Sequence, residues 1–198
     1  MEQPKYFRPL ALKWATPPDW AQVALHDFDA FLLDHAACER KASAVGMSFV
    51  VRYPDRSLLI EPMIAFAREE LEHFHQVYRL VEARGLMLEA DAPDIYVNRL
   101  MAQVRNGRDE RFLDRLIVSS VIEARGHERL SLITEALTDA SLKALYQRLT
   151  RAEDRHKDLF VDLALNYFSP EVVQERLDYF LELEAEAIQE VPFRSAIH

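Results

Sequence analysis

The sequence predicts an all-α fold. Only four of the 198 residues are glycine, which favours long uninterrupted helices over a turn-rich β fold. Apolar residues recur in steps of three and four over long stretches, the period of an amphipathic helix. Prolines and turn residues separate these stretches. A chain of this length can bury one large core, so we expect a single domain over residues 1–198.

The first predicted helix runs from about residue 19 to residue 52. Residues 1–18 before it should be irregular, because several prolines interrupt any periodicity. Two polar residues, His35 and Glu39, interrupt its apolar stripe. Small residues near Gly46 would let a partner helix approach closely. Tyr53-Pro54 then ends the helix.

A second predicted helix spans about residues 57–84 and ends before Gly85. Glu70 lies on its apolar stripe and His73 lies beside that stripe. Residues 86–108 should form a long crossover, with a short helix near residues 95–104. Such a connection between the second and third long helices is typical of one class of four-helix bundle.

The third predicted helix spans about residues 109–137, with Asp109 as its N-cap. The fourth starts at Thr138-Asp139 and runs to about residue 168. A fifth helix, from about residue 169 to residue 189, should pack outside the four-helix core. The last residues, 191–198, are predicted to be frayed.

Two Glu-x-x-His motifs lie on buried faces of these helices, Glu70 with His73 and Glu153 with His156. Residues three apart lie on neighbouring turns of one helix face, so a carboxylate and an imidazole can reach one metal ion. The same spacing also joins Glu72 to His75. That pair lies on a solvated face, so its position relative to the apolar stripe excludes it.

Each motif follows an inward glutamate at nearly the same distance. Glu39 lies 31 residues before Glu70, and Glu123 lies 30 residues before Glu153. A segment of this length can complete one helix, form a turn and return along an antiparallel helix to the same height in the bundle. Two Glu-x-x-His motifs with two further inward glutamates are typical of ferritin-like di-iron or di-manganese bundles. The predicted metal ligands are Glu39, Glu70, His73, Glu123, Glu153 and His156.

Burying several carboxylates without cations would cost several kcal/mol each, which metal ions would offset. Oxygen and nitrogen ligands without thiolate suit iron or manganese better than structural zinc. His35 is expected to be a core or ligand-supporting histidine. His127, one turn after Glu123, could either support the metal site or serve packing alone.

The composition limits the partners and the location. The formal net charge is −9, which does not favour nonspecific binding to nucleic acid. The single cysteine, Cys38, fits a reducing compartment, and no apolar run is long enough to span a bilayer. We therefore expect a cytoplasmic protein without a membrane partner.

Five blocks of the chain resemble a known family, the tRNA-(2-methylthio-N6-isopentenyladenosine-37) hydroxylases. The resemblance covers about residues 10–168 and keeps the order and spacing of the blocks. Gly126-His127 departs from the Ser-Cys expected after Glu-Ala-Arg, which affects substrate positioning more than metal binding. The blocks are Trp14-Ala15-Thr16-Pro17-Pro18-Asp19-Trp20, Asp34-His35-Ala36-Ala37-Cys38-Glu39-Arg40-Lys41-Ala42, Ala67-Arg68-Glu69-Glu70-Leu71-Glu72-His73-Phe74, Ile122-Glu123-Ala124-Arg125 and Glu153-Asp154-Arg155-His156.

The resemblance implies a non-haem di-iron monooxygenase with two iron ions, O₂ as co-substrate and an external electron donor such as a reductase or ferredoxin. It would hydroxylate the isopentenyl group of adenosine-37 in the anticodon stem-loop of tRNA. The alternative is a ferritin-like ferroxidase or iron-handling protein. An acidic tRNA enzyme still needs local basic surface. The candidate tRNA contacts are Arg52, Arg56, Arg105, Arg108, Arg111 and Arg115, and a solvated mixed-charge surface is the alternative interpretation.

Overall fold

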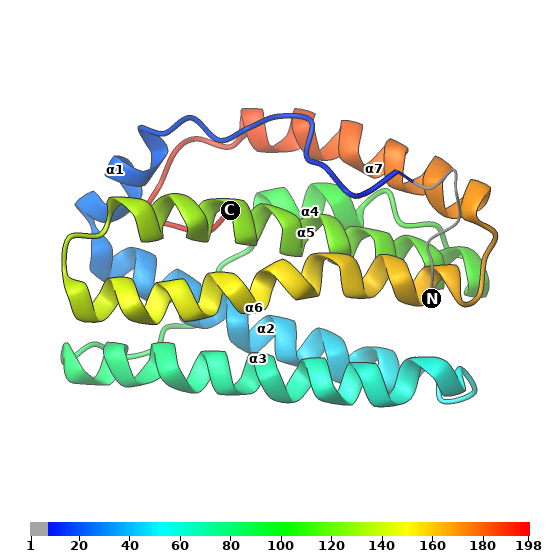
Figure 1. The fold of residues 1–198 in the computed structure, drawn as a ribbon, viewed down its shortest axis with the longest axis horizontal. Helices are drawn as coiled ribbons and strands as arrows, with labels where there is room; N and C mark the ends of the chain where they lie inside the picture. The colour runs from blue at the N-terminus through cyan, green and yellow to red at the C-terminus, as the bar shows by residue number, and fades with distance from the viewer. Residues whose placement is uncertain (1–7) are drawn as a thin grey trace. The chain divides into compact units, whose positions relative to one another are not determined.

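The structure is a computed structural model that describes residues 8–198. Within this range it contains seven α-helices and no strand (Figure 1). The described residues form two compact units. One comprises residues 19–92 and 193–197, and the other comprises residues 8–18, 93–192 and 198. The predicted single domain over the whole chain stays a prediction.

The first of these units is built on a helical hairpin. It contains α1 (Trp20–His26), α2 (Phe28–Arg52) and α3 (Ser57–Ala83). The prediction of one helix over residues 19–52 is wrong at Asp27, which has φ −120° and ψ 75°. The Asp27 side chain accepts a hydrogen bond from the Ala30 backbone N–H at 3.1 Å. Asp27 therefore ends α1 and caps α2, the role for which aspartate competes with helix continuation.

Helices α2 and α3 pack against each other at close range. A Cβ added at Gly46 would lie 2.9 Å from Phe66 Cδ1 and 3.0 Å from Ala67 Cβ. These distances are tighter than side chains normally allow, so the small residue permits the close approach expected from the sequence. Gly85 has φ +72° just after α3, which is the left-handed conformation of a helix C-terminus.

Residues 193–197 belong to the same unit and are held by hydrogen bonds. The Ile197 backbone N–H donates to Asp34 Oδ2 at 2.7 Å, and Ser195 Oγ donates to the Val23 carbonyl at 3.1 Å. Ala196 and Ile197 are buried. The frayed end predicted for residues 191–198 is therefore wrong over this stretch.

The second unit contains α4 (Ile95–Met101), α5 (Arg108–Ala136), α6 (Ala140–Leu165) and α7 (Pro170–Glu190). The short helix and the long helices match the predicted order. The N-cap of α5 is Gly107 instead of the predicted Asp109, which lies in the first turn. Helix α6 starts next to Thr138-Asp139, as predicted, and Asp139 caps it by accepting from the Leu142 N–H at 2.8 Å. Helix α6 ends at residue 165, three residues earlier than predicted.

In this unit α5 and α6 run antiparallel side by side, and α7 packs against α4, α5 and α6 (Figure 1). The fifth long helix thus lies outside the α5–α6 pair, as expected. Residues 8–18 form no helix, and the first seven residues of the predicted irregular segment lie outside the described range. Among the described helices, none is both long enough and apolar enough to cross a membrane.

Candidate metal centre

Glu39 lies on the buried face of α2, where two histidines approach its carboxylate. His35, one turn earlier on the same helix, donates from Nε2 to Glu39 Oε1 at 2.7 Å. His73 on α3 places its Nδ1 3.5 Å from Glu39 Oε2. All three side chains are at least nine-tenths buried. From the sequence we expect His35 to be a core or ligand-supporting histidine, and the contact with Glu39 is one that a ligand-supporting histidine would make.

Glu70 and His73 share one face of α3, as the Glu-x-x-His spacing predicts. His73 Nδ1 lies 3.7 Å from Glu70 Oε2. Together with Glu39 they form a first triad, in which one ligand atom from each residue lies within 4.8 Å of the others. One helical hairpin thus brings two carboxylates and one imidazole together.

The ionisation of Glu39 suits a metal ligand. Burial alone would raise the pKa of its carboxyl group, but hydrogen bonds from His35 and His73 outweigh burial. They hold the pKa of Glu39 well below its ordinary value, so the carboxylate is charged at neutral pH. A carboxylate must be deprotonated to bind a metal ion.

A second triad is formed by Glu123 on α5 with Glu153 and His156 on α6. His156 Nδ1 lies 3.5 Å from Glu153 Oε2, and the ligand atoms of the three residues lie within 4.8 Å of one another. Glu153 and His156 are buried, whereas Glu123 is half-buried. The second helical pair therefore repeats the donor set of the first.

The donor set of each triad fits a metal ion. Two ligand atoms about 2.1 Å from one ion, at right angles, would lie about 3.0 Å apart. The observed separations of 3.5–3.7 Å between imidazole nitrogen and carboxylate oxygen are close to this value. Two oxygens and one nitrogen without thiolate favour iron or manganese.

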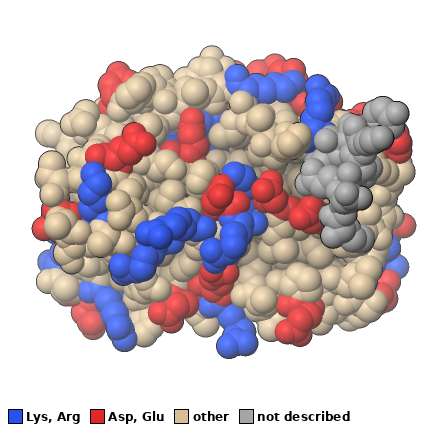
Figure 2. Space-filling model, in the orientation of Figure 1, with Lys and Arg blue, Asp and Glu red and all other residues tan. Residues whose placement is uncertain are grey.

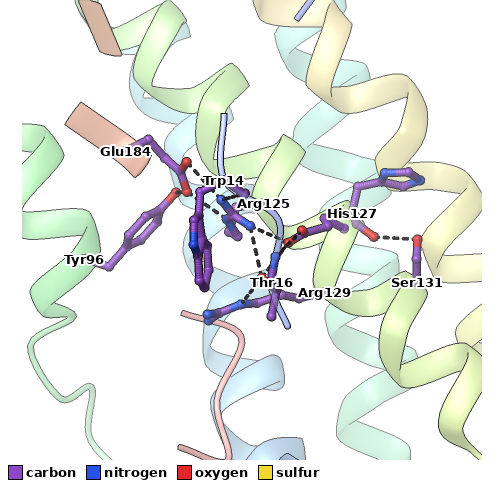
Figure 3. Close-up of polar contacts among 9 residues, drawn as sticks. Trp14, Thr16, Tyr96, Arg125, His127, Arg129, Ser131 and Glu184 are labelled. Atoms are coloured by element: carbon purple, nitrogen blue, oxygen red, sulfur yellow. Dashed lines mark hydrogen bonds and ion pairs between the residues drawn. The ribbon is translucent and has the colours of Figure 1, made fainter. Parts of the chain in front are cut away.

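His127 lies on α5 one turn after Glu123, but its ring interacts with another group. Its Nε2 is 3.7 Å from Asp154 Oδ1 on α6. Burial, followed by the charge of Lys157, lowers the pKa of the His127 ring, so the imidazole is neutral at neutral pH. In Figure 3 the ring points away from the buried side chains around Arg125. A role for His127 near the metal site stays a prediction.

The candidate tRNA-binding arginines are spread over both units. Arg52 and Arg108 are exposed, whereas Arg56, Arg111 and Arg115 are half-buried. Arg105 is engaged inside its unit, since its Nε and Nη2 donate to the two carboxylate oxygens of buried Asp114 at 2.9 and 2.8 Å. Arg105 is thus poorly available for an external phosphate.

A buried polar cluster centred on Arg125 was not predicted from the sequence (Figure 3). Arg125 Nε donates to Glu184 Oε1 at 2.7 Å, and Nη2 donates to Glu184 Oε2 at 3.0 Å. The same guanidinium donates to Thr16 Oγ1 at 3.0 Å, to the Trp14 carbonyl at 2.9 Å, and to Glu128. Arg125 therefore joins α5 to α7 and to the irregular segment before α1.

Tyr96 on α4 completes this cluster by donating its hydroxyl to Glu184 Oε1 at 3.2 Å. Burial and the Glu184 charge raise the pKa of Tyr96 well above its ordinary value, so the hydroxyl keeps its proton. One signal in the sequence could have revealed the cluster. Glu184 interrupts an apolar stripe of α7 formed with Leu177, Phe180 and Ile188, and a charge in such a position requires a buried partner.

Comparisons with known proteins agree on a family. A family model described as tRNA-(MS2IO6A)-hydroxylase (MiaE) matches residues 7–198. The tRNA 2-(methylsulfanyl)-N(6)-isopentenyladenosine(37) hydroxylase of Pseudomonas putida is 34% identical over 186 residues, which are 92% of this chain and 90% of that protein. The enzyme of the same name from Salmonella typhimurium is 34% identical over 130 residues, which are 66% of this chain and 47% of that protein.

Among solved structures, a Synechococcus protein described as having aldehyde deformylating oxygenase activity has a similar fold. The TM-score is 0.89 at 36% sequence identity, with 94% of each chain covered. The all-α, ferritin-like fold class predicted from the sequence is confirmed.

Proposed function

This chain belongs to the tRNA-(MS2IO6A)-hydroxylase family, and from that premise we propose that its two triads together hold a di-iron centre. The protein is an enzyme, a monooxygenase that hydroxylates the isopentenyl group of 2-methylthio-N6-isopentenyladenosine at position 37 of tRNA. The proposed ligands are Glu39, Glu70, His73, Glu123, Glu153 and His156.

The observation that carries this proposal is the repetition of one donor set. Each helical pair contributes two carboxylates and one imidazole, and each triad has its ligand atoms within 4.8 Å of one another. A di-iron carboxylate centre in a helix bundle would be held by four carboxylates and two histidines, which is the sum of the two triads. The nearly equal spacing of Glu39 from Glu70 and of Glu123 from Glu153 supports their use in one centre.

When bound, the iron ions supply the activation of O₂ and the insertion of one oxygen atom into a C–H bond. The chain's own residues prepare the ligands for this chemistry. His35 fixes the orientation of the Glu39 carboxylate through the 2.7 Å hydrogen bond, and Phe31 packs beside the His35 ring with 6.0 Å between ring centroids. Such supporting contacts hold ligands in place and exclude water.

The remaining partners are proposed from the family membership. O₂ is the co-substrate, and two electrons per turnover come from an external donor such as a reductase or ferredoxin. The anticodon stem-loop of tRNA docks on basic surface, for which Arg52, Arg56, Arg108, Arg111 and Arg115 remain candidates and Arg105 a weaker one. A cytoplasmic location is proposed because the substrate is tRNA.

The ferroxidase alternative finds no support in the comparisons, since the family model and both curated relatives describe a tRNA hydroxylase. Nucleoside analysis of tRNA from cells with and without this protein tests the function. We expect the hydroxylated nucleoside only when the protein is present. Identical nucleoside profiles in the two strains would overturn the assignment.

A further inference from the structure

We propose that three arginines on the exposed face of α6, Arg148, Arg151 and Arg155, bind phosphates of the tRNA anticodon arm. This basic row rests on the tRNA hydroxylase function and names the surface through which the substrate docks. The three side chains are exposed and lie three and four residues apart, which places them along one face of the helix. The row extends over about 10 Å, at 1.5 Å per residue.

The arginines of the row donate to carbonyl oxygens of their own helix, one turn earlier. Arg148 Nη1 donates to the Ala144 carbonyl at 3.1 Å, and Arg151 Nε donates to the Gln147 carbonyl at 3.0 Å. A guanidinium carries five N–H donors, so one backbone bond each orients Arg148 and Arg151 while further donors of these two side chains can bind a phosphate. By contrast, Arg105 uses its Nε and Nη2 donors to bind the buried carboxylate of Asp114.

A groove of about 400 Å³ between α5 and α6, lined by residues with polar side chains, lies beside the row. Ser131 donates its hydroxyl proton to the His127 carbonyl at 2.8 Å, which leaves its oxygen as an acceptor. Thr134 and Thr150 share a hydrogen bond at 3.1 Å, in which either hydroxyl can donate. Ser131 and Thr150 are the hydroxyls nearest the surface of the groove. Acceptors next to a basic row suit ribose 2′-hydroxyl groups, which RNA carries and DNA lacks. The groove is lined by Ser131, Thr134, Glu135, Gln147, Thr150 and Arg151.

The local charge favours an anion in spite of the net charge of −9. Asp154, an exposed carboxylate on α6, forms an ion pair with Lys157, which reduces its repulsion of a phosphate. Glu135 in the groove and Asp158 on α6 are the acidic residues that oppose binding. Figure 2 shows basic side chains gathered over α6, with acidic side chains beside them. An acidic protein that binds tRNA needs a local surface of this kind.

The row lies on the same helix as two of the proposed metal ligands. Glu153 and His156 occupy the buried face of α6, at the same height as Arg151 and Arg155 on the exposed face. A helix with its side chains is about 10–12 Å across. Phosphates bound on the row would therefore hold the nucleic acid within about one helix diameter of the ligands.

The test is the affinity of an anticodon stem-loop RNA for the iron-loaded protein, measured by fluorescence anisotropy at several salt concentrations. We compare R148E/R151E with R68E/R79E, which makes the same change in charge at exposed positions of α3. We expect R148E/R151E to weaken binding at least ten-fold. The slope of log affinity against log salt should fall by about 1.5, the loss of two phosphate contacts.

A charge-preserving variant, R148K/R151K, should keep most of the affinity, and iron content should be unchanged in every variant. Equal weakening by R68E/R79E would mean that only net charge matters and would overturn the proposal. Wild-type affinity and salt slope in R148E/R151E would overturn it as well. If the wild-type protein binds no tRNA at all, the tRNA function itself fails together with the surface.

Discussion

Arg125 and Glu184 form a bidentate ion pair with no exposed side-chain surface, at 2.7 and 3.0 Å. The pair joins α5 to α7 and lies two residues after Glu123, a proposed ligand. An ion pair removed from water is costly to break, because the remaining partner keeps a buried charge, and Arg125 would then have Glu128 in place of two carboxylates. The pair is thus expected to fix the turn of α5 that carries Glu123.

Replacing Glu184 with glutamine should lower the free energy of unfolding by about 2 kcal/mol, because Arg125 would keep its buried charge and retain the partly exposed Glu128 as its charged partner. Urea unfolding measures the change. The matched control is Glu182→Gln, also on α7, whose ion pair with Lys13 is exposed. The control should cost less than about 1 kcal/mol. Equal losses in the two variants would contradict a special role for the buried pair.

Asp114 gives a prediction about pH. Burial would raise the pKa of its carboxyl group, but hydrogen bonds from Arg105 and Arg176 outweigh burial and lower that pKa below its ordinary 3.8. A lowered pKa in the folded state adds stability that is present above pH 3.8 and is lost as the pH falls below it. Asp114→Asn should therefore destabilise the protein by about 2–3 kcal/mol at pH 7, and the loss should shrink by up to about 1 kcal/mol as the pH falls from 3.8 to 3.

Urea unfolding of wild type and Asp114→Asn at several pH values measures this difference. Asp91→Asn, which removes an exposed partner of Arg40, serves as the control and should change stability by less than about 1 kcal/mol. A difference between wild type and Asp114→Asn that stays constant from pH 7 to pH 3 would rule out the charged Asp114 as its cause.

His35 should tune metal affinity without being a ligand. Replacing it with glutamine weakens the support of Glu39, and loss of such a supporting contact typically reduces metal affinity about 10- to 100-fold. Iron titration of the folded protein measures the effect. His75→Gln is the control, because His75 is exposed on the face of α3 that lies opposite the buried His73. Wild-type iron affinity in the His35 variant would show that His35 does not support the metal ligands.

Arg108 and Arg111 test the tRNA contacts proposed at the start of α5. Reversing both charges should weaken tRNA binding and reduce its salt dependence, because phosphate contacts release counterions. Anisotropy with the same stem-loop RNA measures both quantities. Affinity unchanged at low and high salt would exclude these two residues, whatever the result for the basic row of α6.

The sequence predicted the elements that follow from periodicity. The stripes around Glu70 and Glu153 gave the long helices and the buried faces on which both triads lie, because burial and helical phase are local properties. The break at Asp27 was missed, since the apolar stripe continues through it and a cap depends on one side-chain hydrogen bond. The packing of residues 193–197 was also missed, because it depends on Asp34 and Val23, more than 160 residues away.

The polar pairs between residues that lie far apart in the chain were also not predicted from the sequence. Asp114 and Arg176 lie 62 residues apart, and Arg125 and Glu184 lie 59 residues apart, so no local pattern connects them. Glu184 interrupts an apolar stripe, which indicates that a partner exists but does not identify it. Similarly, the surface arginines were chosen by sequence clustering, which could not show that Arg105 is engaged by Asp114 or that α6 carries a row.

The most direct test of the di-iron hydroxylase is a reaction of purified protein with a reductant, ¹⁸O₂ and prenylated tRNA, followed by mass spectrometry of the nucleosides and an iron count. We expect a hydroxylated nucleoside carrying one ¹⁸O atom, with iron retained at about two per chain. His73→Ala and His156→Ala should each lose iron and product. Unmodified tRNA with release of ferric iron, or full iron occupancy in both histidine variants, would contradict the account.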